Sequence, residues 1–129
     1  MHLSRTHAVR GSHGRFSLKT VQEFFPLLKR RRWAKAEKFL ELTVKNLGVD
    51  EWINGYVHAL SGMIAALKMP NLPPKPYIVK LEDFSNKKLI HIKDMFTDIS
   101  NTMNSKNAFD AGYFRAWKDF THYALKTQD

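Results

Sequence analysis

A cluster of five closely spaced cations is the part of this sequence best suited to chemistry with a polyanion. Its members are Lys29, Arg30, Arg31, Arg32 and Lys35. Four adjacent cations repel one another unless water or an anion screens them, and guanidinium groups bind phosphate through paired hydrogen bonds. Trp33, inside the cluster, could stack on a base, although tryptophan is more often a packing anchor. The cluster therefore indicates either contact with nucleic-acid phosphates or a solvated turn whose cations a helix dipole favours.

The first 16 residues carry a second set of cations. Arg5, Arg10 and Arg15 recur every five positions, with histidines between them. Because this segment has no apolar periodicity, we expect it to be a flexible arm in water, and such arginine-rich arms often fold only on RNA. Residues 10–13, Arg-Gly-Ser-His, also resemble affinity-tag sequence. The arm is predicted to contact phosphates, or else to be a mobile tail without a binding role.

The positive charge is concentrated at the start of the chain. The formal net charge is +9 over 129 residues, and residues 1–35 hold nine Lys or Arg residues against the single acid Glu23. Residues 36–129 hold the other twelve cations and eleven acids, so this part is almost neutral. Such segregation is typical of proteins that bind a polyanion with one end.

Arg115 and His122 are separated by six residues, and this spacing resembles the R-x4–6-H pattern of HEPN ribonucleases, which are also helical bundles. The resemblance implies that the Arg and His would act on the RNA 2′-hydroxyl and phosphate. Ala116 stands where that family often has a polar residue. The alternative is a surface arginine and a partly buried histidine ring, and we expect this alternative, with no catalytic residues.

Several other classes of function are excluded or not supported. The chain has no cysteine, which rules out disulfides, thiolate zinc sites and cysteine nucleophiles. No zincin, P-loop, dinucleotide-binding or nucleophile-elbow motif occurs, so no metal, cofactor or small-molecule substrate is predicted. The longest apolar region, 57–69, is interrupted by polar residues and is too short for a membrane helix. We therefore predict a cytoplasmic protein, although a basic, acid-free start also resembles a transit peptide.

Apolar periodicity predicts an all-α fold of about five helices, with an N-terminal basic extension. The expected helices span 18–31, 33–47, 51–68, 86–103 and 108–126. Pro26 must open or kink the first of them, and Asp50 and Ser85 are predicted N-caps. The expected organisation is an arm over 1–16 and one helical domain over 17–129, with helices in 17–68 and 85–127 joined by an extended, Pro-rich connection over 69–84.

The sequence contains an internal duplication with an offset of 57 residues. Gly55, Tyr56 and Ala59 coincide with Gly112, Tyr113 and Ala116, and Trp52 coincides with Phe109. The two halves therefore read as similar helical hairpins. Gly and Ala four positions apart leave a stripe without bulky side chains, which lets another helix approach closely. Two such hairpins are expected to pack as a bundle, with a solenoid as the competing architecture.

These observations favour a non-enzymatic RNA-binding protein that belongs to, or associates with, a ribonucleoprotein such as the ribosome. Phosphate contacts are predicted for the five clustered cations and the three arginines of the arm. The alternative is a protein–protein adaptor without a nucleic-acid role, whose partner is another protein or a second copy of this chain. In that case an exposed aromatic patch would contact the partner, made of Tyr56, Tyr113, Phe114 and Trp117.

Overall fold

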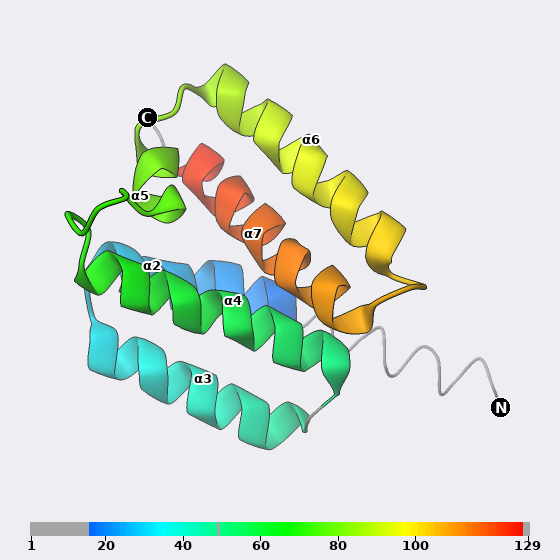
Figure 1. The fold of residues 1–129 in the computed structure, drawn as a ribbon. Helices are drawn as coiled ribbons and strands as arrows, with labels where there is room; N and C mark the ends of the chain where they lie inside the picture. Colours follow the sequence, from blue (N-terminus) through cyan, green and yellow to red (C-terminus); the bar gives the residue numbers. More distant parts are fainter. Residues whose placement is uncertain (1–15, 49, 128–129) are drawn as a thin grey trace, which may run out of the picture.

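The computed structural model describes residues 16–48 and 50–127, and every regular element in these ranges is helical (Figure 1). The expected all-α class, with about five helices packed as a bundle, is confirmed. The elements are a π-helical segment η1 (Thr20–Phe24) and six helices: α2 (Phe25–Lys29), α3 (Trp33–Leu47), α4 (Glu51–Lys68), α5 (Tyr77–Glu82), α6 (Asn86–Met103) and α7 (Ala108–Lys126). None of these helices is long and apolar enough to cross a membrane.

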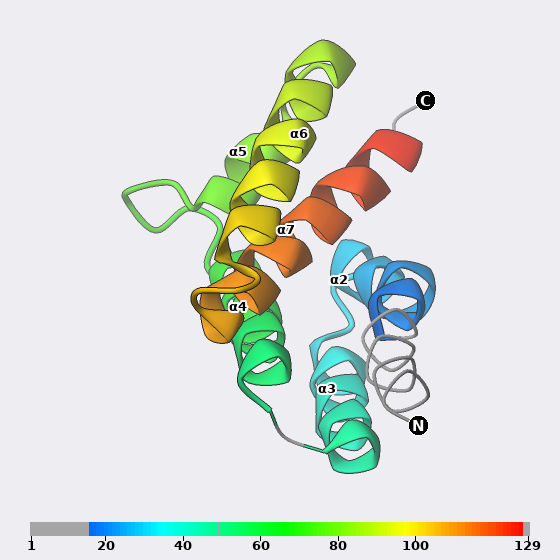
Figure 2. The same cartoon turned by 90° about the vertical axis from the view of Figure 1, so that its right-hand side faces the viewer.

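Helix α7 lies at the centre of the bundle. It packs along α6 on one side and crosses α4 on another, and these are the two most extensive helix contacts. Figure 2 shows α7 between α6 and α2, with α3 at the outer edge. The two hairpins therefore differ in how tightly their helices pack. In the second hairpin α6 packs along α7, whereas in the first hairpin α3 contacts α4 only sparsely and also contacts α2.

The first helix begins earlier than expected. Helical structure is present from Phe16, which is only 1% exposed and lies with its ring centroid 4.6 Å from that of Tyr56. The expected boundary between arm and domain, after residue 16, was wrong by this one residue, because the Phe16 ring is part of the core. The rest of the expected arm, residues 1–15, lies outside the described residues.

Pro26 is accommodated by a change of helix type. The backbone forms π-helical turns over η1 and returns to α-helical geometry in α2, where Pro26 occupies the first turn. A proline at this position needs no N–H partner, and a π segment widens the helix locally. The helix continues to Lys29, so Pro26 changes its geometry without ending it.

The connection 69–84 contains a helix that the sequence pattern did not predict. Its four prolines all precede Tyr77, and α5 begins directly after Pro76. Ile78 and Leu81, three positions apart, are at most 1% exposed and anchor α5 in the core. The expected extended connection was therefore wrong for 77–82, because two apolar residues at helical spacing gain burial there.

The four long helices have the predicted bounds, and the N-caps of α4 and α7 follow the duplication. The Asp50 side chain accepts a hydrogen bond from the Ile53 N–H at 2.7 Å. Asn107, 57 positions later, accepts one from the Asp110 N–H at 3.1 Å. Such bonds satisfy amide groups that have no partner inside the helix. α4 and α7 therefore begin with the same kind of side-chain N-cap, at equivalent positions of the two repeats.

The crossing of α4 and α7 brings the repeated glycines face to face. A Cβ atom at Gly55 would overlap the backbone carbonyl of Phe109, and one at Gly112 would overlap the carbonyl of Trp52. Trp52 and Phe109 are themselves related by the 57-residue offset, so the contact has an approximate two-fold relationship. The expectation that the small-residue stripes permit close approach is confirmed, and each stripe is the other's partner.

Candidate nucleic-acid interface

The clustered cations of residues 29–35 lie at the end of α2, in the turn that follows it and in the first turn of α3, and we call this segment the basic turn. Arg31 N–H donates to the Leu28 carbonyl at 3.1 Å, and Arg32 N–H donates to the Leu27 carbonyl at 2.9 Å. These two bonds form a Schellman motif, in which the residue after the C-cap adopts left-handed backbone geometry. That residue is Arg31, with φ of 58°. Glycine is the usual choice at this position, because other residues are strained there.

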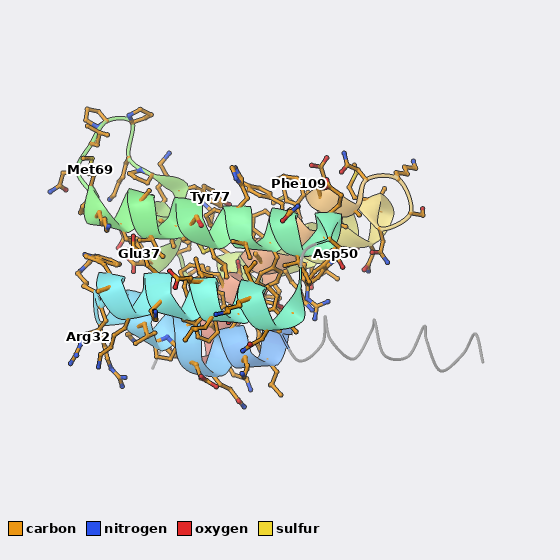
Figure 3. All side chains as sticks on the ribbon, turned by 90° about the horizontal axis from the view of Figure 1, so that it is seen from below. Arg32, Glu37, Asp50, Met69, Tyr77 and Phe109 are labelled. Atoms are coloured by element: carbon orange, nitrogen blue, oxygen red, sulfur yellow. The ribbon has the colours of Figure 1, made fainter. Side chains whose placement is uncertain are left out.

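All five cations of the basic turn are exposed, and none forms an ion pair with an acid of residues 16–48 or 50–127. Glu37, the next acid along the chain, pairs instead with Lys68 at 3.2 Å. Figure 3 places Arg32 at the outer edge of the molecule, at the start of α3. Among residues 16–48 and 50–127, the hydrogen-bond partner of the Arg31 guanidinium is the Leu67 carbonyl, at 3.5 Å. The basic turn therefore presents its charge to solvent.

Trp33 is less accessible to a nucleic-acid base than the exposed cations beside it are to phosphates. Its ring is partly buried and packs against the hydrophobic core, which supports the interpretation as a packing anchor. The arginines predicted in the arm, Arg5, Arg10 and Arg15, lie outside the described residues. Among the predicted phosphate contacts, only the five cations of the basic turn are thus brought together by the structure.

The second candidate pair, Arg115 and His122, shares one surface depression with two lysines. We call this depression the basic groove. It has a volume of about 440 Å³, and its lining residues are Ser17, Leu18, Val21, Lys93, Arg115, Lys118, Asp119 and His122. α7 supplies the floor of the groove. Lys93 of α6 lies on one side of it, and residues 17–21, which precede α2, lie on the other. Residues three, four and seven positions apart share one face of a helix, which explains why Arg115, Lys118 and His122 converge.

A buried carboxylate anchors the floor of the basic groove. Asp119 is 5% exposed, accepts a hydrogen bond from the Tyr56 hydroxyl at 2.6 Å, and accepts a second from Arg115 Nε at 3.1 Å. Burial, followed by the negative charge of Asp119, raises the pKa of Tyr56 well above its usual value. Tyr56 therefore stays protonated and acts as a fixed donor that ties α4 to α7.

No protein-family model matches this chain, and neither does any curated protein or solved structure.

His122 is held in a cationic environment. Its Nδ1 lies 3.1 Å from Lys93 Nζ, and burial, followed by the charges of Lys93, Lys126 and Lys118, lowers the pKa of the ring. An ammonium group can only donate, so Nδ1 of the neutral ring accepts and the proton resides on Nε2. In this arrangement the second ring nitrogen, Nε2, carries a hydrogen and is a hydrogen-bond donor. That geometry suits hydrogen bonding to an anion better than abstraction of a proton.

The aromatic patch expected for an adaptor does not form as predicted. Tyr56 is 0% exposed, so its assignment to an exposed patch was wrong. The ring of Phe114 stacks on Phe96, and Trp117 packs against Phe96 and Tyr77. Tyr113, Phe114 and Trp117 are all partly buried. Because these rings fill the space between α7 and its neighbours, they offer little free area to a partner.

Lys93 and Lys118 are site residues that the sequence analysis did not select. Lys118 could have been found, because it lies three positions after Arg115 and four before His122 on one helix. Lys93 comes from α6, and no spacing rule within α7 points to it. Its place in the basic groove depends on how α6 packs along α7.

Proposed function

We propose that this chain is a non-enzymatic RNA-binding protein that docks on RNA, within a ribonucleoprotein such as the ribosome, through its basic turn. One observation carries the proposal: five exposed cations lie within seven residues and have no acidic partner among residues 16–48 and 50–127. RNA phosphates would supply the negative counter-charge that no acid of these residues provides to the basic turn.

The strained backbone at Arg31 supports the same proposal. A left-handed arginine is less stable than a glycine in the same place by about 1 kcal/mol. The chain nevertheless keeps a cation here, between two others, where a glycine would relieve the strain. A charge that is held at the expense of stability is expected where that charge contacts a ligand.

The proposed contact is with the phosphate backbone and does not select a sequence by itself. Three consecutive exposed arginines would each contact a phosphate oxygen through their guanidinium groups. Arg5, Arg10 and Arg15 would add contacts to the same polyanion. The nearly neutral remainder of the chain would face neighbouring proteins.

A charge-matched pair of variants tests the proposal. The first variant changes Arg30, Arg31 and Arg32 to Ser. The control changes Lys45, Lys87 and Lys106 to Ser, which removes the same charge from three exposed positions outside residues 29–35, on α3, on α6 and in the turn after α6. Filter binding to a labelled single-stranded RNA at fixed salt is the measurement.

We expect the basic-turn variant to lose at least tenfold in affinity, since each lost phosphate contact weakens binding, while the control stays within about threefold of the unmodified protein. Circular dichroism checks that both variants remain helical. Equal losses in the two variants would show that only net charge matters, and this result would overturn the assignment to the basic turn.

A further inference from the structure

We propose that the basic groove is a binding site for a phosphate group, separate from the basic turn. Its donors come from two helices: Lys93 on α6, and Arg115, Lys118 and His122 on α7. The inference does not rest on the proposed RNA role, because it follows from the composition and geometry of the groove alone.

The groove contains more positive charge than its acid can neutralise. Three cations line it together with one carboxylate, Asp119. That carboxylate is buried and already accepts hydrogen bonds from Tyr56 and Arg115. It therefore fixes the position of the Arg115 guanidinium, and its single negative charge is opposed by the three positive charges of Lys93, Arg115 and Lys118. An uncompensated charge remains at the surface of the groove, where an anion can reach it.

The anchoring of Arg115 also orients it for a ligand. Its Nε donates to Asp119 Oδ1 at 3.1 Å, in an i, i+4 pair along α7. The two terminal nitrogens of the guanidinium form no ion pair with an acid of the described ranges. A guanidinium that is held by its Nε and open at its terminal nitrogens presents a planar pair of donors, which matches two oxygens of a phosphate.

The remaining donors surround the same space. Lys93 Nζ approaches His122 Nδ1 at 3.1 Å, so Nε2 is the ring nitrogen of His122 that carries the hydrogen and can donate to a ligand. Lys118 lies on the same face of α7, about one helical turn from both Arg115 and His122. A tetrahedral oxyanion has several acceptor oxygens and can use donors that approach from more than one helix. A phosphate group therefore fits this donor set better than a planar carboxylate.

The titration behaviour of the groove agrees with this geometry. Burial, then the nearby charges of Arg115 and Lys93, lowers the pKa of Lys118. Burial and the neighbouring lysines likewise lower the pKa of His122. In both groups burial is the largest cause, the neighbouring cations add to it, and the charge of Asp119 opposes it. A bound phosphate would favour the protonated form of both groups and would therefore raise the pKa of each.

The test is an NMR titration of the full chain with inorganic phosphate, at constant ionic strength maintained with chloride. His122 is assigned from the ring signal that disappears in His122→Gln. We expect saturable movement of the His122 signal and a rise in its pKa when phosphate is present. His58 and His91, both exposed and outside the groove, are internal references and should not follow the same curve.

Substitutions in the groove provide the control. Lys93→Gln and Lys118→Gln should each weaken the phosphate response at least fivefold, whereas Lys106→Gln, at an exposed position outside the groove, should leave it unchanged. The basic-turn variant should also retain the response, which separates this proposal from the one above. A linear, unsaturable shift shared by all histidines, or an unchanged response in both groove variants, would overturn the proposal.

A second arm identifies the source of the phosphate. If Lys93→Gln and Lys118→Gln also weaken binding of a single-stranded RNA, the group in the groove is a phosphodiester of that RNA. If RNA affinity is unchanged while the inorganic phosphate response is lost, the groove serves a free phosphate compound. Both results support the site, and they differ only in where its ligand comes from.

Discussion

Gly55 of α4 and Gly112 of α7 lie at one helix crossing, where each glycine faces the backbone carbonyl of the residue three positions before the other glycine. The absence of two Cβ atoms allows the two backbones to touch. Since both residues belong to the repeated string Gly-Tyr-x-x-Ala, the duplication encodes a contact between its own two copies. This crossing sets the position of α7, and α7 carries the floor of the basic groove.

Gly55→Ala and Gly112→Ala are each expected to destabilise the fold by about 2 kcal/mol or more, because the new methyl group meets a backbone carbonyl that cannot rotate away. The measurement is the free energy of unfolding from urea denaturation. The double variant should be less destabilised than the sum of the single variants, since one separation of α4 from α7 relieves both clashes.

Gly62 provides the matched control for these variants. It also lies within α4, but a Cβ atom there would meet nothing within 4 Å. Gly62→Ala is therefore expected to stabilise the chain by about 0.5–1 kcal/mol, through the better helix propensity of alanine. A loss of stability at Gly62, or none at Gly55, would contradict the account of the crossing.

Tyr56→Phe should cost about 1–3 kcal/mol at neutral pH, since it removes the hydrogen bond to Asp119 Oδ2 and leaves a buried carboxylate with one partner fewer. The pKa of Tyr56 is raised in the fold, so the unfolded chain releases this proton first, near pH 10. The stability contributed by Tyr56 is present below that pH and is lost as the pH rises above it.

Urea unfolding at pH 7 and above pH 10 measures both effects of Tyr56→Phe. The difference between the unmodified protein and the variant should narrow at the higher pH. Tyr113→Phe, at the equivalent position of the second copy, is the control; Tyr113 is only partly buried, and we expect a change of about 0.5 kcal/mol or less. Equal losses at the two tyrosines would refute a special role for the Tyr56–Asp119 contact.

His122 should make the fold less stable in acid. Its pKa is lowered in the fold by burial and by Lys93, Lys126 and Lys118, against the opposing charge of Asp119. The unfolded chain therefore binds this proton more readily, and stability falls as the pH drops through about 6.5. In phosphate-free buffer, His122→Gln should flatten the decline in unfolding free energy below that pH. His91→Gln, at an exposed site on α6, should follow the unmodified protein.

Arg31→Gly should separate stability from binding. The glycine relieves the left-handed strain at φ of 58°, so the free energy of unfolding should rise by up to about 1 kcal/mol, while RNA affinity falls. Arg32, with φ of −91°, is the control. Arg32→Gly should lower RNA affinity by a similar factor and lower stability by up to about 1 kcal/mol, because it only adds freedom to the unfolded chain. The account fails here if Arg31→Gly binds RNA normally.

Local patterns in the sequence were sufficient to predict the long helices. Apolar periodicity with Asp50 and Ser85 as caps gave bounds that the structure reproduces, because those features act within one helix. Helix α5 was missed, since it is only six residues long and is stabilised by burial of Ile78 and Leu81 against other elements. A short helix of this kind depends on tertiary contacts that no local pattern contains.

The two candidate sites also differ in how far local sequence predicts them. The basic turn is contiguous in sequence, so its residues could be selected directly, although the left-handed Arg31 could not. The basic groove needs Lys93 from α6 beside three residues of α7, and this depends on helix packing. Tyr56 was predicted to be exposed only under the adaptor alternative, as part of an aromatic patch. The structure buries it, since Asp119 supplies a partner for its hydroxyl across the crossing.

The central claim, that the basic turn neutralises RNA phosphates, is tested most directly by the salt dependence of RNA binding. The logarithm of the dissociation constant is measured against the logarithm of the salt concentration for the unmodified protein and for the variant with Arg30, Arg31 and Arg32 changed to Ser. Each phosphate contact on a single strand contributes about 0.7 to the slope, so the variant's slope should be shallower by up to about 2. Identical slopes and affinities would contradict the claim.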